Sequence, residues 1–474
     1  MLRFFKSSLP AQVLALLLLV LGLRLPLLLP GLPPTTTEVL ALLTGERLHD
    51  GALLYRDLYV GTGPLAAVLF GALDVLASRP LGLYRALALL LLLAQALRFN
   101  QVLNRADVLP ERGYVAALIY LIVSSLSTDL DALSPLLLGH TFVVFALSAL
   151  LPTSREGYDN RRLFRAGFLL GLGALCYLPL ALFTVLGSFA VVIFAANAFR
   201  SFLLLLCGLV FPTALAATLF FYFGALPGFQ QFYLDPGWQI LTSGAAAVGQ
   251  LPASLQLRLL AGPLLLLLLG VLRGVGTTLG PVFQAKFRQV MLVWTLVVLG
   301  IMALSRGTAA GMLVLLLPPL AYFSLFLSQK MRPAWVPELL FLVVLAGTVV
   351  VRYRAYVPGL ATRLRLPLES SFGLLPDPRF ARLQGHTLLV LGPGLRPYLS
   401  ARSATPYLDW PLAQADLGHL NEYVAVVRTA RRSTPPPDFI LDQTKLLPRL
   451  SQQLPGVFGN YQKVEGVAGL YQKK

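Results

Sequence analysis

The sequence predicts an all-α polytopic membrane protein, with about eleven transmembrane helices and a small C-terminal extracytoplasmic α/β domain. Two observations predict this fold class. Of the 474 residues, 57% are hydrophobic and 12% are charged, whereas about a quarter of the residues of an ordinary soluble domain are charged. The hydrophobic residues also fall in repeated runs of roughly 16 to 24, close to the length that crosses a hydrocarbon core about 30 Å thick.

The first apolar run follows Arg3 and Lys6 and extends from Leu9 to Leu32. It resembles a signal peptide, but it is too long and has no small-x-small cleavage site before Pro33, so we expect it to stay as a span. The later spans are expected near residues 82–98, 113–127, 134–151, 165–179, 180–198, 201–223, 255–272, 289–304, 308–327 and 335–351.

The apolar segment Pro64–Ala77 is expected to lie along the outer interface and not to cross the membrane. It contains Asp74, and a carboxylate at bilayer depth is costly. Without this segment as a span, about fifteen Arg and Lys residues fall on the cytoplasmic side. The outer connectors then hold only Arg47, Arg56, Arg79 and Arg306. This asymmetry places a long first loop, residues 33–81, and the C-terminal region outside.

The net charge of +17 is interpreted as a topology signal. The Arg and Lys residues lie mostly between apolar runs and in the C-terminal quarter, with no basic run interleaved with aromatic residues, so nucleic-acid binding is not expected. Both cysteines, Cys176 and Cys207, lie inside apolar runs. The sequence therefore has no disulfide framework and no cysteine pattern that binds a metal.

A change of composition at Arg352 divides residues 1–351, the transmembrane domain, from residues 352–474, a soluble α/β domain. The second domain alternates strand-like and helical segments. Strands are expected at 386–391, 439–441 and 464–471, and helices near 395–401, 417–432 and 445–453. Gly392-Pro393-Gly394 is similar to a phosphate-binding turn, but Pro393 lacks an N–H and no third glycine follows, so the signal is weak.

The first loop carries the most informative pattern in the chain. Glu38 follows the first span, Gly51 precedes Tyr55-Arg56-Asp57, and Gly63-Pro64-Leu65 begins an apolar helix, with Arg85 near the next span. This order resembles the first extracytoplasmic loop of GT-C glycosyltransferases, such as protein O-mannosyltransferases and the lipid A aminoarabinose transferase. That resemblance covers residues 1–230 loosely and the whole chain in general layout.

The resemblance implies transfer of a sugar from a polyprenyl-phosphate carrier, in a bacterial inner membrane, to an extracytoplasmic acceptor. In that family the loop usually carries Asp-Glu, and the Asp is the catalytic base. Here the pair is Thr37-Glu38, and a threonine hydroxyl cannot accept the proton near neutral pH. The departure favours common ancestry more strongly than it favours activity.

Two carboxylates of the first loop are therefore candidate catalytic residues. Glu38 is a candidate base in place of the missing Asp, and its alternative role is that of a first-turn residue of a helix capped by a threonine. Asp57 is the second candidate, and its alternative is an ion pair with Arg56 or Arg47 that positions the loop.

Asp129 and Asp131 lie at an outer membrane edge and are candidate ligands for Mg²⁺ or Mn²⁺, which prefer oxygen donors. The alternative is that they cap the following helix, which starts near Ser134-Pro135.

A lipid-phosphate donor needs a cation on the outer side of the membrane. The candidates are Arg306, in the turn Ser305-Arg306-Gly307, and Arg56 and Arg85. Each of these arginines has the alternative of extending to lipid headgroups.

The sequence thus favours an integral-membrane glycosyltransferase of the GT-C type. A catalytically inactive GT-C-fold scaffold or cell-envelope assembly component, with residues 352–474 as its partner-binding part, is the alternative. A transporter or flippase is a third reading, but charged residues are nearly absent from the spans and no pair of interrupted helices is evident.

Overall fold

The structure is a computed structural model. It describes residues 4–7, 9–28, 33–106, 112–151, 160–195, 197–242, 253–275, 282–304, 309–328, 335–366, 373–404, 406–408, 410, 413–414, 436–464 and 467–474.

The chain folds as two compact units. The first, here called the helical unit, comprises Met1–Leu32, Gly82–Ala216 and Gly237–Ser371. The second, here called the mixed unit, comprises Pro33–Leu81, Ala217–Pro236 and Phe372–Lys474. The first loop and the C-terminal region therefore belong to one unit, although about 290 residues separate them in the sequence. The predicted domain boundary at residue 352 rests on a change of composition, and it stays a prediction.

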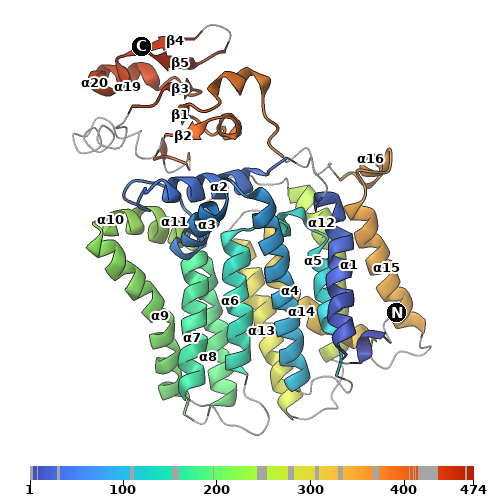
Figure 1. Cartoon of the computed structure of the whole chain (residues 1–474). Coiled ribbons are helices and arrows are strands. Elements are labelled where there is room, and N and C mark those ends of the chain that lie inside the picture. The colour runs from blue at the N-terminus through green and yellow to red at the C-terminus, as the bar shows by residue number, and fades with distance from the viewer. Residues whose placement is uncertain are drawn as a thin grey trace. The chain divides into compact units, whose positions relative to one another are not determined.

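The helical unit is a bundle in which a helix coincides with each of the eleven predicted spans (Figure 1). The all-helical prediction for this region is confirmed. These helices are α1 (Pro10–Leu28), α4 (Leu81–Arg105), α5 (Val115–Ser124), α6 (Pro135–Leu150), α7 (Asn160–Cys176), α8 (Phe183–Phe194), α9 (Ala198–Tyr222), α12 (Ala253–Val275), α13 (Val282–Leu304), α14 (Ala309–Ser328) and α15 (Trp335–Arg352).

Four of the described helices are long and apolar enough to cross a membrane by length and composition: Leu81–Arg105, Ala198–Tyr222, Phe283–Leu304 and Trp335–Arg352. The apolar side chains of α9 and α15 are mostly exposed, and Phe199, Phe211 and Val343 are each more than half exposed. Continuous apolar faces are unfavourable in contact with water, whereas contact with lipid tails carries no such penalty. The protein is therefore a membrane protein.

Glycines allow close packing in the middle of the helical unit. A Cβ atom at Gly139 of α6 would lie 2.9 Å from the Gly173 carbonyl of α7. A Cβ atom at Gly167 of α7 would lie 2.0 Å from the Leu205 carbonyl of α9. Small residues at such positions bring helix backbones together where lipid removes the hydrophobic drive for association.

The helical unit also contains a buried polar network. Gln95 of α4 accepts a hydrogen bond from Tyr120 of α5 (2.7 Å) and lies 3.0 Å from His140 Nδ1 of α6. Its amide Nε2 donates to Thr141 at 2.7 Å. Hydrogen bonds between helices thus pair Gln95 with Tyr120 and Thr141, and they give His140 a partner at Nδ1 inside an apolar helix.

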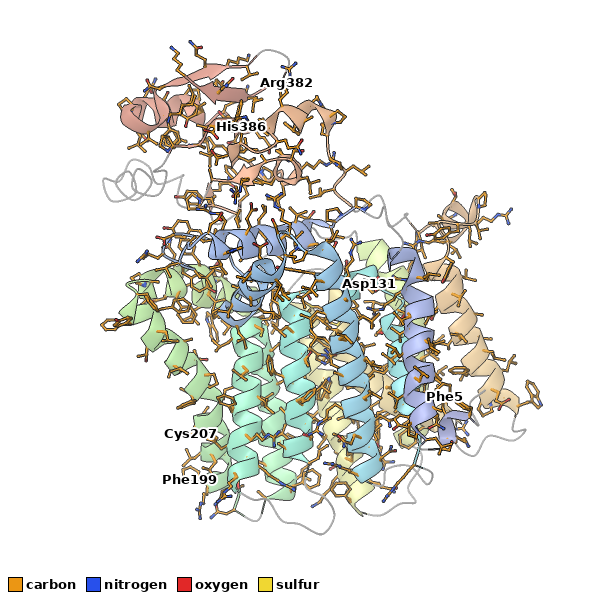
Figure 2. All side chains as sticks on the ribbon, viewed as in Figure 1. Phe5, Asp131, Phe199, Cys207, Arg382 and His386 are labelled. Atoms are coloured by element: carbon orange, nitrogen blue, oxygen red, sulfur yellow. The ribbon has the colours of Figure 1, made fainter. Side chains whose placement is uncertain are left out.

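A buried ion cluster joins three distant segments of the helical unit. Asp131, which is 2% exposed, lies 3.2 Å from Arg24 Nη1 of α1 through Oδ1, and its Oδ2 accepts a hydrogen bond from Arg352 Nη2 of α15. Arg24 also donates to the Leu130 carbonyl, and Arg352 donates to the Leu23 carbonyl. Figure 2 shows Asp131 and Phe5 at opposite ends of the bundle.

The mixed unit begins with two short helices, α2 (Thr36–His49) and α3 (Pro64–Leu76), that pack against each other. Pro64 follows the N-cap Gly63, a position where the missing N–H has no consequence. The carboxylate of Asp74 is buried, and it accepts from the Arg79 backbone N–H and lies 2.9 Å from His49 Nδ1. The expected helix at 64–77 is confirmed, and its carboxylate is satisfied inside the unit.

A small sheet completes the mixed unit (Figure 1). Its strand order is β2-β1-β3-β5-β4. Strands β1 (Thr387–Leu391), β2 (Arg402–Ser403) and β3 (Phe439–Asp442) are parallel, whereas β5 (Leu470–Lys473) is antiparallel to both β3 and β4 (Tyr461–Lys463). Two helices, α19 (Leu447–Gln453) and α20 (Pro455–Phe458), lie between β3 and β4 in the chain. The predicted α/β class of this region is confirmed.

Several details of that region differ from the prediction. The expected helix at 395–401 is a short 3-10 turn, Arg396–Leu399, because β2 follows it directly. The last strand begins at Leu470 and not near residue 464, because the chain forms the separate strand β4 and then turns at Gly469, whose φ is +76°. The expected helix at 417–432 lies outside the described residues.

We expect Asp131→Asn to destabilise the protein, because it leaves two buried guanidinium groups without their shared carboxylate. Loss of one partner of a buried ion pair costs about 3–5 kcal/mol, so the thermal unfolding temperature in detergent should fall by several degrees. Asp129→Asn is the matched control, because Asp129 is an exposed residue of the same connection. Equal unfolding temperatures for the two variants would show that the cluster does not stabilise the helical unit.

Candidate functional site

The Tyr55-Arg56-Asp57 segment of the first loop forms a tight turn in the mixed unit, here called the Tyr55 turn (Leu53–Leu58). Leu53 accepts from the Asp57 N–H at 2.8 Å, and Tyr55 donates its N–H to the Leu58 carbonyl at 2.9 Å. Tyr55 has a φ of +63°, a region that costs a non-glycine residue about 1–3 kcal/mol. Such strain persists only where surrounding contacts enforce it.

Buried aromatic residues supply those contacts. The Tyr55 hydroxyl donates to the Thr62 carbonyl at 2.6 Å, and its ring lies 5.1 Å from Phe220 and 5.6 Å from Phe229. Gly228 contacts the turn so closely that a Cβ atom there would lie 1.9 Å from the Tyr55 carbonyl oxygen. The turn is therefore fixed by side chains from residues 217–236, which belong to the same unit.

The turn presents a charged pair at the surface. Arg56 donates to Asp57 through Nε and Nη2, both at 3.0 Å, and the side chains are 49% and 38% exposed. Burial alone acts to raise the pKa of Asp57. Hydrogen bonds from Arg56 and the Leu53 N–H, with the charges of Arg56 and Arg47, hold that pKa below its ordinary value of 3.8. Asp57 is therefore ionised at neutral pH.

Glu38 has different surroundings. It is 2% exposed, and its Oε2 accepts from the Thr35 N–H at 2.8 Å and from the Thr35 hydroxyl at 3.2 Å. The Thr35 hydroxyl in turn accepts from the Glu38 N–H, so the two residues form a capping box at the start of α2. This contact is the helix-capping alternative considered for Glu38, and the catalytic role of Glu38 stays a prediction.

Arg79 connects the first loop to the C-terminal part of the mixed unit. Its guanidinium donates to Glu46 of α2 at 2.7 Å, to the Tyr398 carbonyl at 2.7 Å and to the Ala401 carbonyl at 2.9 Å. Arg402 lies 3.4 Å from the other oxygen of Glu46. The carboxylate of Glu46 is buried between these two arginines, so it aligns α2 with the start of β2.

The other candidate residues lie in the helical unit. Arg85 is a buried residue of α4, and Asp129 and Asp131 lie in the connection between α5 and α6. Arg306 lies outside the described residues. The structure thus brings Arg56, Asp57 and Glu38 together in the mixed unit. It places Arg85, Asp129 and Asp131 in the helical unit.

Whether a metal ion could bind at Asp131 depends on the groups around its carboxylate. Both of its oxygens face guanidinium groups, and two such positive charges oppose a divalent cation. Among the described residues, no three His, Cys, Asp or Glu side chains gather as a metal site would require. The metal role of Asp129 and Asp131 stays a prediction.

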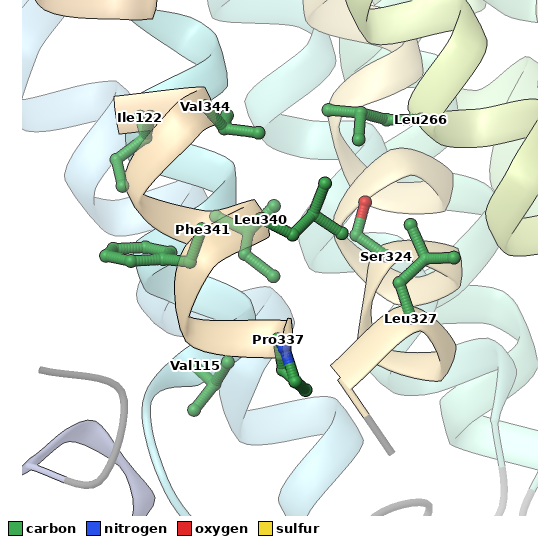
Figure 3. Close-up of a pocket in the computed structure, with 10 residues that line it drawn as sticks. Val115, Ile122, Leu266, Ser324, Leu327, Pro337, Leu340, Phe341 and Val344 are labelled. Atoms are coloured by element: carbon green, nitrogen blue, oxygen red, sulfur yellow. The ribbon is translucent and has the colours of Figure 1, made fainter. Parts of the chain in front are cut away.

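An apolar crevice lies between α5, α12, α14 and α15 of the helical unit (Figure 3). Ile122, Leu266, Leu340 and Phe341 are among the ten residues that line it, and Ser324 contributes a hydroxyl. A crevice with this lining suits a hydrocarbon chain.

Comparison with known proteins places the chain near one group of solved structures. No protein-family model matches it, and no curated protein matches it in sequence. The oligosaccharyltransferase of Archaeoglobus fulgidus tethered to an acceptor peptide is similar with a TM-score of 0.45 and 12% identity, over 78% of this chain and 56% of that chain. This chain thus spans little more than half the length of that enzyme.

Two further structures of the same archaeal enzyme are similar. The complex of AglB with an inhibitory peptide and a dolichol-phosphate has a TM-score of 0.45 and 11% identity, and covers 78% of this chain and 56% of that chain. The complex with Zn and sulfate has a TM-score of 0.46 and 12% identity, and covers 95% of this chain and 71% of that chain.

Sequence reasoning missed the contacts of Arg79 with the Tyr398 and Ala401 carbonyls and of Tyr59 with Tyr407. The Tyr59 ring lies 5.3 Å from the Tyr407 ring, and Tyr59 donates its N–H to the Pro406 carbonyl. Both contacts join residues more than 300 positions apart, so no local pattern predicts them.

We expect Arg79→Met to loosen the mixed unit, because a buried carboxylate and two backbone carbonyls lose a charged donor. Hydrogen bonds to charged groups contribute about 1.5–3 kcal/mol each, so amide hydrogen exchange in α2 and residues 398–403 should rise at least tenfold. Arg382→Met is the matched control, because Arg382 is an exposed arginine of the same unit (Figure 2). Unchanged exchange in both variants would mean that Arg79 does not hold these segments.

Proposed function

We propose that the protein is an integral-membrane glycosyltransferase of the GT-C type that moves a sugar from a polyprenyl-phosphate donor to an extracytoplasmic acceptor. The observation that carries the proposal is the Tyr55 turn, a strained backbone that presents the exposed Arg56–Asp57 pair. Strain of this kind concentrates at functional sites. The order of motifs in the first loop, which resembles the GT-C pattern, supports the same proposal.

In the proposed reaction, Arg56 binds the donor phosphate. Guanidinium groups bind phosphate in the same two-bond geometry that Arg56 uses on Asp57. An exposed ion pair stabilises by only about 0–1 kcal/mol, so phosphate displaces the carboxylate at small cost. Arrival of the donor thus releases Asp57 from its partner and makes it a stronger base.

Asp57 then takes the proton of the acceptor hydroxyl. The acceptor oxygen forms the new bond to the anomeric carbon, while the bond from that carbon to the phosphate oxygen breaks with inversion. The long Arg56 side chain moves with the phosphate and stabilises its charge as it leaves. This movement allows base and leaving group to act from opposite faces of the sugar.

The apolar crevice supports the lipid part of the proposal. A polyprenyl chain is a branched hydrocarbon that needs an apolar surface, and the crevice on α15 offers one (Figure 3). Because the chain comes from an equally apolar bilayer, the crevice holds it through packing contacts.

A catalytically inactive scaffold is the second candidate, and the capping box favours it. Glu38 occupies the place of the family's acidic motif, and its Oε2 is engaged by Thr35 at the start of α2. A protein that uses this fold only as a scaffold needs Glu38 as a helix cap but needs no catalytic base. The mixed unit is then the part that binds a cell-envelope partner.

We expect Asp57→Asn to lower sugar transfer from a polyprenyl-phosphate donor by about 10²–10⁴-fold, the usual effect of losing a general base. Glu38→Gln is the matched variant, because glutamine completes a capping box as glutamate does but accepts no proton. The measurement is the rate of sugar transfer by each purified variant in nanodiscs. If Asp57→Asn retains sugar transfer and Glu38→Gln loses it, the catalytic base is Glu38 and not Asp57.

Absence of transfer by the wild-type protein with every polyprenyl-phosphate sugar tested would favour the scaffold. Cross-linking in membranes would then identify its partner through the mixed unit.

We expect Leu340→Trp to weaken binding of the long-chain donor, because the larger ring fills the crevice. The KM for a long polyprenyl donor should rise about tenfold, while the KM for a short-chain donor changes little. Leu339→Trp is the control, since Leu339 is exposed on the same helix and lines no part of the crevice. Equal KM changes in the two variants would contradict a chain-binding role for the crevice.

A further inference from the structure

A second cleft lies in the mixed unit, at the carboxyl ends of β1 and β3. Its lining includes residues 393–397 after β1, Gln443 after β3, Phe380, and Thr36 at the start of α2. Its volume is about 220 Å³, below the roughly 300–1,000 Å³ of sites for drug-sized ligands. The cleft therefore suits a ligand of one or two rings.

The topology of the sheet points to this cleft as a binding site. Strand β1 pairs in parallel with β2 on one side and with β3 on the other. The chain leaves β1 toward β2 and returns on the far side to form β3. In open α/β sheets, ligands bind outside the carboxyl ends of the strands where the strand order reverses in this way. The cleft lies at that point.

Two glycines fix the position of Gln443 beside the cleft. A Cβ atom at Gly392 would lie 2.6 Å from the Gln443 Cβ, and one at Gly394 would lie 2.6 Å from its Nε2. Gly394 donates its N–H to Gln443 Oε1 at 3.2 Å. Since Pro393 has no N–H and the Gly394 N–H is bonded to Gln443, the turn Gly392-Pro393-Gly394 is a poor phosphate cradle. Recognition therefore depends on side chains.

Those side chains combine flat apolar faces with a few polar groups. Phe380 and Pro397 form walls, and Gln443, Thr36 and Arg396 supply an amide, a hydroxyl and a guanidinium. Arg396 is the one charged residue among the described lining residues. The nearby Asp377 accepts hydrogen bonds from Arg379, and Asp442 accepts from three N–H groups of the segment that leads into α19.

We propose that this cleft binds an acidic saccharide. The apolar face of a sugar ring packs on Phe380, its hydroxyls bond to Gln443 and Thr36, and its carboxylate pairs with Arg396. Thr36 precedes Glu38 by two residues and adjoins Thr35 of the capping box, so the cleft borders the first loop. The identification of this saccharide as the acceptor of transfer rests on the proposed function, whereas the cleft and its chemistry do not.

Binding to the full-length protein in nanodiscs tests the proposal. The probes are digalacturonate, an acidic disaccharide, and maltose, an uncharged one, and saturation-transfer NMR with calorimetry gives both affinities. We expect digalacturonate to bind about fivefold more tightly. Arg396→Met should remove that difference, and Gln443→Leu should weaken both probes by about fivefold. Arg379→Met is the matched control, because Arg379 adjoins Phe380 but does not line the cleft.

Three outcomes would overturn the proposal: no saturable binding of either probe, equal binding of both, or binding that Arg396→Met and Gln443→Leu leave unchanged. The transfer assay is separate from this test. Binding without transfer by the wild-type protein would keep the saccharide site and reject the proposed transferase. Transfer that is normal in Arg396→Met and Gln443→Leu would keep the transferase and reject the cleft as its acceptor site.

Discussion

The guanidinium of Arg79 makes the contact on which the mixed unit depends. It joins Glu46 of α2 to the backbone carbonyls of Tyr398 and Ala401, which are more than 300 residues away in the sequence. A buried carboxylate needs a cation, and free backbone carbonyls need donors, so one planar group with five N–H donors satisfies both requirements. The first loop thereby becomes part of the C-terminal unit, and the Tyr55 turn and the cleft at β1 and β3 belong to one body.

The two units differ in the polarity of the groups that they present. The helical unit presents apolar faces, binds its polar groups to one another and offers an apolar crevice. The mixed unit carries the exposed pair of Arg56 and Asp57 and the polar cleft. Apolar chains and hydrophilic ligands thus find matching chemistry in different units.

Much of this fold follows from patterns that act over short stretches of sequence. The apolar runs predict the helices because a chain in lipid must satisfy its backbone hydrogen bonds within each segment. Asp74 distinguishes α3 from a span because a carboxylate is costly at bilayer depth. Thr35 and Glu38 have the three-residue spacing of a capping box, and the structure contains that box.

Other features depend on contacts that no local pattern contains. Asp131 meets Arg24 and Arg352, which lie 107 and 221 residues away, and the sequence alone favoured a metal or a cap for this residue. Strands β2 and β4 have two and three residues, too few for a recognisable alternation. The strain at Tyr55 comes from aromatic side chains of residues 217–236, so its motif was visible but its geometry was not.

The cluster of Arg24, Asp131 and Arg352 has a consequence for the biogenesis of the protein. Arg24 lies on the first helix of the bundle and Arg352 ends the last, so synthesis delivers the three charges in order, with more than 200 residues between the second and the third. Until α15 is synthesised, the Asp131 carboxylate has Arg24 as its guanidinium partner, and the pair is electrically neutral. Arg352 then adds the second guanidinium, so the last helix of the eleven completes a contact that the first helix began.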